Sequence, residues 1–228
     1  MLGTIVNTTT ILTGSIIGSR INKGIKEEHQ QVMFNAMGLA AFGLGINSVV
    51  QNMPNSAYPV LFIISLAVGS LVGELLDIDG RFKRLTDRFS GGNSLAQGLS
   101  TGILLFCVGT LSILGPIQSA LYGDNTYLFT NATLDFFSAT VLASTYGIGM
   151  GAAAIVLFCW QGAIYLCAGF LGPFLSQELL TEISVIGGFL IASSGMSILN
   201  VKQFKTMNML PCLLVPPVWF LIKGVIGL

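Results

Sequence analysis

The sequence predicts an all-α, polytopic integral membrane protein with about eight transmembrane helices. Hydrophobic residues make up 53% of the 228-residue chain, whereas Asp, Glu, Lys and Arg together make up 9%. Soluble domains carry about 25% charged residues, so a soluble protein of this composition could not cover its surface with polar groups. Apolar stretches of about 20 residues, the length needed to cross a bilayer, recur along the sequence. We therefore expect residues 1–228 to form a single transmembrane domain.

Eight stretches are long and apolar enough to be transmembrane helices. No basic region or obvious cleavage site accompanies the first stretch, so we interpret it as a retained helix and not as a signal peptide. The fifth stretch is short and polar, and the glycine-containing segment 146–151, which is suited to a tight turn, separates it from the sixth. The eight stretches are residues 2–19, 32–50, 57–77, 97–117, 132–148, 151–172, 182–200 and 209–227.

The basic residues predict the orientation of these helices, because cytoplasmic loops are enriched in Lys and Arg. With eight spans, the three basic loops lie on one side of the membrane. Only Lys223 falls toward the other side, where its long side chain can reach the interface. Both termini are then non-cytoplasmic. The basic residues are Arg20, Lys23 and Lys26 in the first loop, Arg81, Lys83, Arg84 and Arg88 in the third, and Lys202 and Lys205 in the seventh.

Residues 78–96 are predicted to be a cytoplasmic amphipathic connector. A surface helix is expected within it at 80–92, because Phe82, Leu85 and Phe89 have the spacing i, i+3 and i+7 and basic residues occupy the polar side. Such a helix could sense anionic lipids, or it could simply anchor the connector at the membrane interface.

A weak internal similarity predicts an inverted repeat. When the sequence is shifted by 150 positions, the first repeat, residues 1–77, matches the second, residues 151–228, and residues 97–150 remain as central helices. Five crossings separate the first span from the sixth, so the two repeats would have opposite orientations, as in many secondary transporters. The matching glycines are Gly38 with Gly188 and Gly45 with Gly195.

The composition argues against several classes of function. Ten basic and ten acidic residues cancel, so nothing predicts a nucleic-acid partner. The four cysteines lie in apolar stretches without a CxxC pair, and we interpret them as packing residues, not as disulfides or zinc ligands. The only histidine, His29, lies in a charged loop. We therefore expect no metal, no cofactor and no enzymatic activity, with the lipid bilayer and a small ion or solute as partners.

Polar side chains inside the apolar stretches are the candidates for function, because a polar group without a partner in hydrocarbon is costly. In the first span, Asn7, Thr10, Gly14 and Gly18 share one helix face. This face could line a polar path near the outer mouth, or it could form a close small-residue contact, within the chain or between copies in a homo-oligomer. Further candidates are Asn47 in the second span, Ser138 in the fifth, Gln161 in the sixth and Ser194 in the seventh.

Two acidic residues are also candidates for binding an ion or a solute. Glu74 lies near the C-terminal end of the third span where, like Asp77 and Asp79, it opposes the helix dipole. It could act near the inner mouth, or it could exchange charge with the basic residues of segment 81–84. Asp135 is expected in the first turn of the fifth span, with Thr133 as a possible N-cap, and is a candidate ion ligand or outer-gate residue.

Prolines are expected to interrupt the fourth and eighth spans. A proline pair at mid-membrane removes backbone donors and kinks or breaks a helix. The freed carbonyl groups could bind a cation where they line a cavity, or neighbouring groups could satisfy them. The prolines are Pro116 in the fourth span and Pro211, Pro216 and Pro217 in the eighth.

Several short motifs are spread over essentially the whole chain. They are Asn7 with Gly14 and Gly18, Phe106-Cys107-x-Gly109 with Ile113-Leu114-Gly115, Leu134-Asp135-Phe136-Phe137, Gly187-Gly188, and Asn208-Met209-Leu210-Pro211. Together these motifs resemble the YdfK/YqgA family of bacterial membrane proteins, a family of unknown function (DUF554). The resemblance implies a bacterial inner-membrane protein, supplies no substrate, and adds Asn208 to the candidates beside Asn7 and Asp135.

These features favour a transporter of a small ion or polar solute. The sequence does not name the substrate, and it leaves open whether the protein is a carrier or an ion channel. The alternative is a non-transporting membrane protein that acts as a sensor or an assembly partner. The near absence of soluble segments weakens this alternative, because it leaves little surface for cytoplasmic partners.

Overall fold

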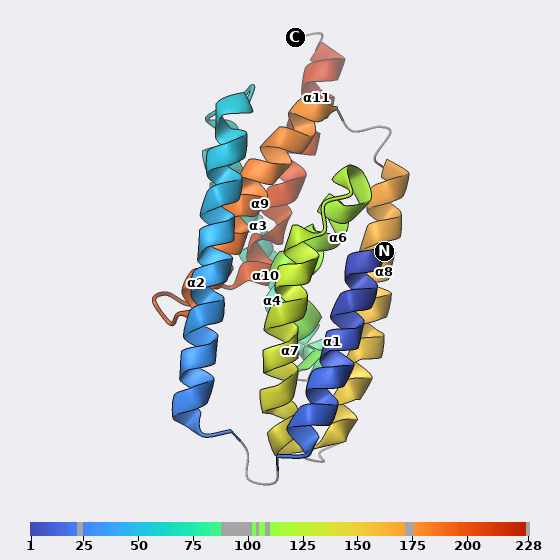
Figure 1. The fold of residues 1–228 in the computed structure, drawn as a ribbon. Helices are drawn as coiled ribbons and strands as arrows, with labels where there is room; N and C mark the ends of the chain where they lie inside the picture. Colours follow the sequence, from blue (N-terminus) through green and yellow to red (C-terminus); the bar gives the residue numbers. More distant parts are fainter. Residues whose placement is uncertain (22–24, 88–101, 104, 108–109, 172–175, 227–228) are drawn as a thin grey trace. The chain divides into compact units, whose positions relative to one another are not determined.

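The described part of the chain is mostly helical. The computed structural model describes residues 1–21, 25–87, 102–103, 105–107, 110–171 and 176–226. Every regular element within these ranges is a helix, which confirms the all-α prediction. The helices are α1 (Leu2–Ser19), α2 (Glu27–Asn52), η1 (Met53–Asn55), α3 (Leu61–Leu76), α4 (Ile78–Asp87), α6 (Thr110–Tyr122), α7 (Thr126–Tyr146), η2 (Ile148–Ala152), α8 (Ala153–Leu171), α9 (Gln177–Ile198), α10 (Thr206–Met209), η4 (Leu210–Leu214) and α11 (Val215–Ile226) (Figure 1).

Five helical stretches in the described part of the chain are long and apolar enough to cross a membrane. They match the second, third, sixth, seventh and eighth predicted spans. α1 and α7 form helices over the first and fifth predicted spans, but both are rich in hydroxyl and amide side chains. The start of the predicted fourth span, 97–101, lies outside the described residues. The protein is thus a helical membrane protein, and its count of eight spans stays a prediction. The five stretches are Glu27–Asn55, Leu61–Arg81, Ile148–Phe170, Gln177–Ile198 and Thr206–Lys223.

Two helix boundaries correct the predictions for the acidic residues. α7 begins at Thr126, six residues before the predicted start, so Asp135 lies in its third turn and not in its first. Thr133 is therefore not an N-cap, and its hydroxyl donates to the carbonyl of Phe129 at 3.0 Å. α4 begins at Ile78, so Asp79 lies in a first turn, where the helix dipole favours an acid. The predicted remainder of the surface helix, 88–92, lies outside the described residues.

The chain divides into two compact units, each built from two separate segments. The first unit comprises Met1–Ala36 and Phe82–Gly172. The second comprises Met37–Arg81 and Pro173–Leu228.

In the first unit, α1 packs closely along α7 and also contacts α8 (Figure 1). A Cβ atom on Gly14 or Gly18 would overlap backbone carbonyl groups of α7, at Phe136 and Thr140 respectively. Glycine is required at both positions because the two backbones approach so closely. The predicted small-residue face of the first span is therefore a close helix contact within the chain. This contact brings Asn7 to the surface of α7.

In the second unit, α2 and α9 run antiparallel and meet through four glycines (Figure 1). A Cβ on Gly45 would overlap α9 at Gly188 and Ala192, and a Cβ on Gly195 would overlap α2 at Phe42 and Gly38. The carbonyl oxygens of Gly45 and Gly38 lie against Gly188 and Gly195 in return. The two helices therefore touch at two matched places, Gly45 with Gly188 and Gly38 with Gly195.

The prolines of the last predicted span fall at helix junctions. Pro211 lies in the first turn of the short 3₁₀ helix η4, and Pro216 and Pro217 lie in the first turn of α11, where a missing N–H costs little. The interruption predicted at the proline pair is thus a 3₁₀ turn that begins one turn earlier. Pro116 is buried inside α6.

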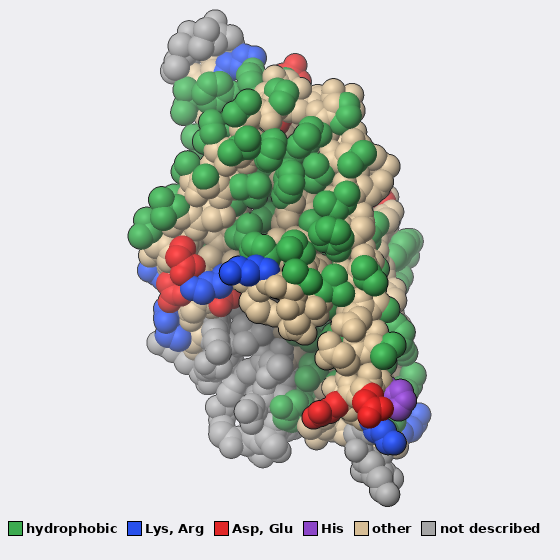
Figure 2. Space-filling view, turned by 90° about the vertical axis from the view of Figure 1, so that its left-hand side faces the viewer, with side chains coloured by type: hydrophobic (Ala, Val, Ile, Leu, Met, Phe, Trp, Pro, Cys, Tyr) green, Lys and Arg blue, Asp and Glu red, His purple; other side chains and the backbone are tan. Residues whose placement is uncertain are grey.

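One face of α3 carries a stripe of exposed apolar side chains. Val60, Ile64, Val68, Leu71 and Leu75 recur every three to four residues and are about half exposed or more. Figure 2 shows hydrophobic side chains gathered over much of one face of the molecule. Single exposed apolar residues are ordinary on soluble proteins, but a continuous helical stripe is typical of a surface in contact with lipid.

Candidate functional site

The first unit contains a buried cluster of three polar side chains, Asn7, Asn131 and Asp135, which we call the Asp135 cluster. Asn131 and Asp135 are each 4% exposed, and Asn7 is completely buried. Asn131 and Asp135 lie one turn apart on α7, and the Asn131 amide donates a hydrogen bond of 2.9 Å to one carboxylate oxygen of Asp135. A carboxyl group is thus held inside a helix bundle by an amide from its own helix.

Asn7 reaches the same place from α1. Its side chain interacts with that of Asp135. No hydrogen bond of standard geometry joins them, and neither the amide nitrogen nor the amide oxygen of Asn7 has a hydrogen-bond partner among the described residues. Its backbone carbonyl accepts from the Thr10 hydroxyl at 2.7 Å. Buried amides almost always have partners, so the Asn7 amide keeps capacity for a further hydrogen bond beside the buried acid.

No basic side chain in the described part of the chain pairs with Asp135. The thiol of Cys107 also interacts electrostatically with Asp135. An isolated ionised carboxylate is expensive to bury, so the group must hold a proton or a cation when the site is closed.

Hydroxyl and amide groups extend the polar interior of the first unit. Ser138 lies one turn beyond Asp135 on α7 and is 4% exposed. The Gln161 amide of α8 donates to the Ser112 hydroxyl of α6 at 3.1 Å, while its amide oxygen has no partner among the described residues. The hydroxyls of Thr4 and Ser15 on α1 are also buried without one. Several side chains of α1, and Gln161 of α8, thus keep unused hydrogen-bonding capacity.

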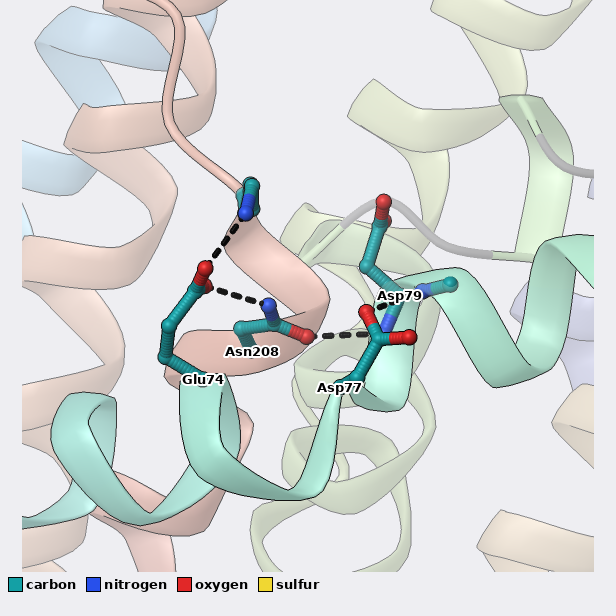
Figure 3. Close-up of polar contacts among 6 residues, drawn as sticks. Glu74, Asp77, Asp79 and Asn208 are labelled. Carbon is teal, nitrogen blue, oxygen red and sulfur yellow. Dashed lines mark hydrogen bonds and ion pairs between the residues drawn. The ribbon is translucent and has the colours of Figure 1, made fainter.

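The second unit carries a separate polar cluster around Glu74, which consists of Glu74, Asp79, Lys205 and Asn208 (Figure 3). Lys205 forms an ion pair with one carboxylate oxygen of Glu74. Asn208 donates to the other carboxylate oxygen at 2.7 Å and accepts from the backbone N–H of Asp79 at 2.7 Å. The Asn208 side chain therefore links the end of α3, the start of α4 and α10.

Local backbone geometry explains why these side chains meet. Gly73 lets α3 approach so closely that a Cβ there would overlap the carbonyl oxygen of Asn208. Asp77 ends α3 in a left-handed conformation with φ of 46°, and its carboxylate accepts from the N–H of Gly80 at 3.2 Å. The chain can therefore turn from α3 into α4 directly beneath Asn208.

The Glu74 cluster is open to solvent. The side chains of Lys205 and Glu74 are 60% and 55% exposed. The hydrogen bond to Glu74, and then its charge, raise the pKa of the Lys205 ammonium above its usual value, so this residue stays charged at neutral pH. The sequence suggested segment 81–84 as the source of a cation for Glu74. The structure instead supplies Lys205, which lies far away in the sequence.

A third acidic group, Glu182, was not predicted as a site residue. Its side chain is 1% exposed, and one carboxylate oxygen accepts from the Ser56 hydroxyl at 2.7 Å and from the Tyr58 N–H at 3.0 Å. Glu182 is the first residue of the predicted seventh span, where an acid is unremarkable. The seventh span was predicted to start at Glu182, but α9 starts at Gln177. The earlier start places Glu182 in the second turn, inside the helix.

The remaining predicted site residues are dispersed. Asn47 is exposed on α2, one residue from the buried Ser48, whose hydroxyl donates to the Ser184 carbonyl at 3.2 Å. Ser194 is partly buried on α9. The structure thus brings together Asn7 with Asp135, and Glu74 with Asn208, and leaves Asn47 and Ser194 outside both clusters.

Comparison with known proteins confirms the resemblance noted in the sequence. The family described as "Protein of unknown function (DUF554)" matches residues 2–221. The chain is 54% identical over 228 residues to the "Uncharacterized membrane protein YdfK" of Bacillus subtilis (strain 168), covering 100% of this chain and 99% of that protein. It is 26% identical over 226 residues to the "Uncharacterized protein YqgA" of Escherichia coli (strain K12), covering 94% of each. No solved structure matches the chain. The chain belongs to the DUF554 family, and it is a membrane protein of that family.

Proposed function

We propose that this protein is a transporter that moves a small ion or a polar solute across the bacterial plasma membrane. The observation that carries the proposal is the Asp135 cluster. A membrane protein rarely keeps an acidic side chain inside its helix bundle without a basic partner, and such residues mark substrate or ion pathways. Here the acid lies beside two free polar atoms of Asn7, which can bind a cargo or a coupling ion.

The glycine contacts between α2 and α9 support an inverted repeat. In the alignment of the sequence with itself shifted by 150 residues, Gly38 corresponds to Gly188 and Gly45 to Gly195. The contact of Gly45 with Gly188 therefore corresponds to the contact of Gly195 with Gly38, and both contacts are present. A pair of contacts that exchange in this way is what a two-fold axis between two repeats would produce. Inverted repeats are common in secondary transporters, so this symmetry agrees with the proposed function.

In this proposal the chain crosses the membrane eight times with both termini non-cytoplasmic. The Glu74 cluster then lies at the cytoplasmic side of the membrane, because the third and seventh predicted loops are both cytoplasmic in this arrangement. Its ion pair between Glu74 and Lys205 ties α3 to the segment before α10.

Transport by the purified chain in liposomes tests the proposal. Solid-supported-membrane electrophysiology would challenge the protein with inorganic cations, anions and small metabolites over a range of pH. We expect a saturable current for one class of solute, and we expect Asp135→Asn to reduce it at least 10-fold because the ionisable carboxyl group is lost. Glu74→Gln should reduce it less, because Gln can keep one hydrogen bond to Asn208.

A matched control and the contrary result make this test decisive. Asn47→Ala removes an exposed polar side chain of α2 and should leave the current unchanged. If all variants carry the same current, the site assignment is wrong. If the correctly inserted protein neither carries current nor takes up radiolabelled solute, the function is that of a non-transporting sensor or assembly partner. A current that does not saturate would identify a channel.

A further inference from the structure

We propose that the ion bound by the Asp135 cluster is a proton, and that Asp135 takes up and releases this proton while Asn7 provides its hydrogen-bond partner. The inference rests on the proposed transport function and specifies its coupling ion. In the buried position that the structure shows, Asp135 would be the neutral acid. The proton would leave Asp135 to water on one side of the membrane and return from water on the other.

The surroundings of Asp135 leave its charge uncompensated. Among the described residues, α1, α6 and η2 pack against α7, and Ile103, Phe106 and Cys107 share a core with it. α1 and η2 contain no titratable side chain, and α6 has only Tyr122 at its far end. Cys107 interacts electrostatically with Asp135, and no described Lys or Arg does. Neutralisation by a proton therefore removes the cost of burying this carboxylate without any further group.

The hydrogen-bonding capacity of the cluster fits a proton. Asn131 donates to one oxygen of Asp135. A protonated Asp135 can donate its O–H to the free amide oxygen of Asn7, whereas an ionised Asp135 can accept from the free amide nitrogen of Asn7. A single amide can thus serve both states of the acid by rotating its side chain. Leucine or alanine at position 7 could serve neither state.

The same arrangement fits a metal cation poorly. Hard cations such as Ca²⁺ and Mg²⁺ take about six or more oxygen ligands. At most, the Asp135 cluster offers the two carboxylate oxygens of Asp135, one of which accepts from Asn131, and the amide oxygens of Asn7 and Asn131, which is fewer than six. Beside the cluster, Gly14 brings α1 against the carbonyl of Phe136, the residue next to Asp135. A proton needs neither additional ligands nor additional space.

Infrared difference spectroscopy and transport together test the inference on the full chain in liposomes. A pH jump from acid to alkaline should remove the carbonyl-stretch band of a protonated buried carboxyl group. We expect this band in the wild-type protein at neutral pH and its loss in Asp135→Asn. We also expect a transmembrane pH gradient to drive the solute current in the wild type, and Asp135→Asn to abolish that coupling. Asp135→Glu, which can still carry a proton, should keep the band at a shifted frequency.

The two readouts separate the possible failures. A neutral-pH band that is absent, or that persists unchanged in Asp135→Asn, overturns the inference even if solute transport is found. A solute current that follows a Na⁺ gradient and ignores a pH gradient also overturns it, while the transport function stands. If the band behaves as expected but the protein moves no solute, the proposed function fails and with it the coupling role of Asp135. Elution of every variant as a single species from size-exclusion chromatography shows that it is folded.

Discussion

At the scale of single residues, three acidic side chains have three different environments. Asp135 is buried without a basic partner, Glu74 is exposed and paired with Lys205, and Glu182 is buried and accepts two hydrogen bonds. An exposed ion pair contributes little to stability because water competes for both charges. A buried acceptor with two donors contributes more, because its loss leaves the donors without partners. Glu182 is therefore the acid that we expect to matter most for folding.

Glu182 can be tested with two substitutions that separate its hydrogen bonds from its charge. Both bonds end on the same carboxylate oxygen, so the side-chain oxygen of Glu182→Gln can accept them. Glu182→Leu leaves the Ser56 hydroxyl and the Tyr58 N–H unpaired and should cost about 1–3 kcal/mol of stability. Thermal unfolding in detergent should therefore show a clear fall in Tm for Glu182→Leu and a small change for Glu182→Gln. Equal losses in both variants would mean that the negative charge itself is required.

At the scale of helices, small residues decide which pairs can approach. α1 meets α7 at Gly14 and Gly18, and α2 meets α9 at four glycines. In a bilayer, close backbone contact replaces the hydrophobic effect as the source of helix association, because lipid is as apolar as the side chains. The position of each candidate site residue, including Asn7 beside Asp135, thus depends on glycines that have no side chain to bind a ligand.

Two glycines on α2 give a matched test of this dependence. A methyl group at Gly45 would overlap the backbone of α9, whereas one at Gly43 meets nothing within 4 Å. We expect Gly45→Ala to destabilise the protein by about 1–3 kcal/mol through overpacking, and Gly43→Ala to leave its stability unchanged or slightly higher. Unfolding in increasing concentrations of SDS would measure the difference. Similar behaviour of the two variants would contradict the close α2–α9 contact.

The predicted two-fold symmetry extends this test to α9. Gly195 takes the place of Gly45 after the shift of 150 residues, and a methyl group there would overlap the backbone of α2. Gly195→Ala should therefore resemble Gly45→Ala in the size of its effect. This agreement would support a common origin of the two helices.

At the scale of the whole molecule, the sequence predicted the positions of the helices far better than the contacts between side chains. Apolar stretches located the helices within a few residues, and Gly147, with φ of 85°, ends α7 in the expected turn. The start of α7 was misplaced because Thr126, Thr130 and Asn131 make its first turns more polar than a typical membrane span. The Glu74 partner could not be predicted, because 131 positions separate it from Lys205 and only the fold brings them together. By contrast, Asn131 and Asp135 have the i, i+4 spacing of neighbours on a helix, a signal that the sequence does contain.

The number of membrane crossings is the remaining prediction at this scale, and Asp124 can decide it. Eight spans place the loop between α6 and α7 outside the cytoplasm and Lys26 inside, because three crossings separate them. If only the five long apolar stretches cross, two crossings separate these positions and both lie on the same side. Both side chains are exposed, so either can be replaced by cysteine for labelling. The background should have its four native cysteines replaced, because Cys159 and Cys167 are exposed.

In intact cells, a membrane-impermeant maleimide should label Asp124→Cys and should label Lys26→Cys only after the membrane is permeabilised. Asn55→Cys serves as a positive control, because one crossing separates position 55 from position 26 in both counts. Labelling of Asp124→Cys only after permeabilisation would show that the fourth predicted span, which contains α6, does not cross, and the eight-span arrangement would be wrong. Labelling from outside would support that arrangement, in which Asp135 and Asn7 lie within membrane-spanning helices and an acid without a basic partner calls for a proton or another cation.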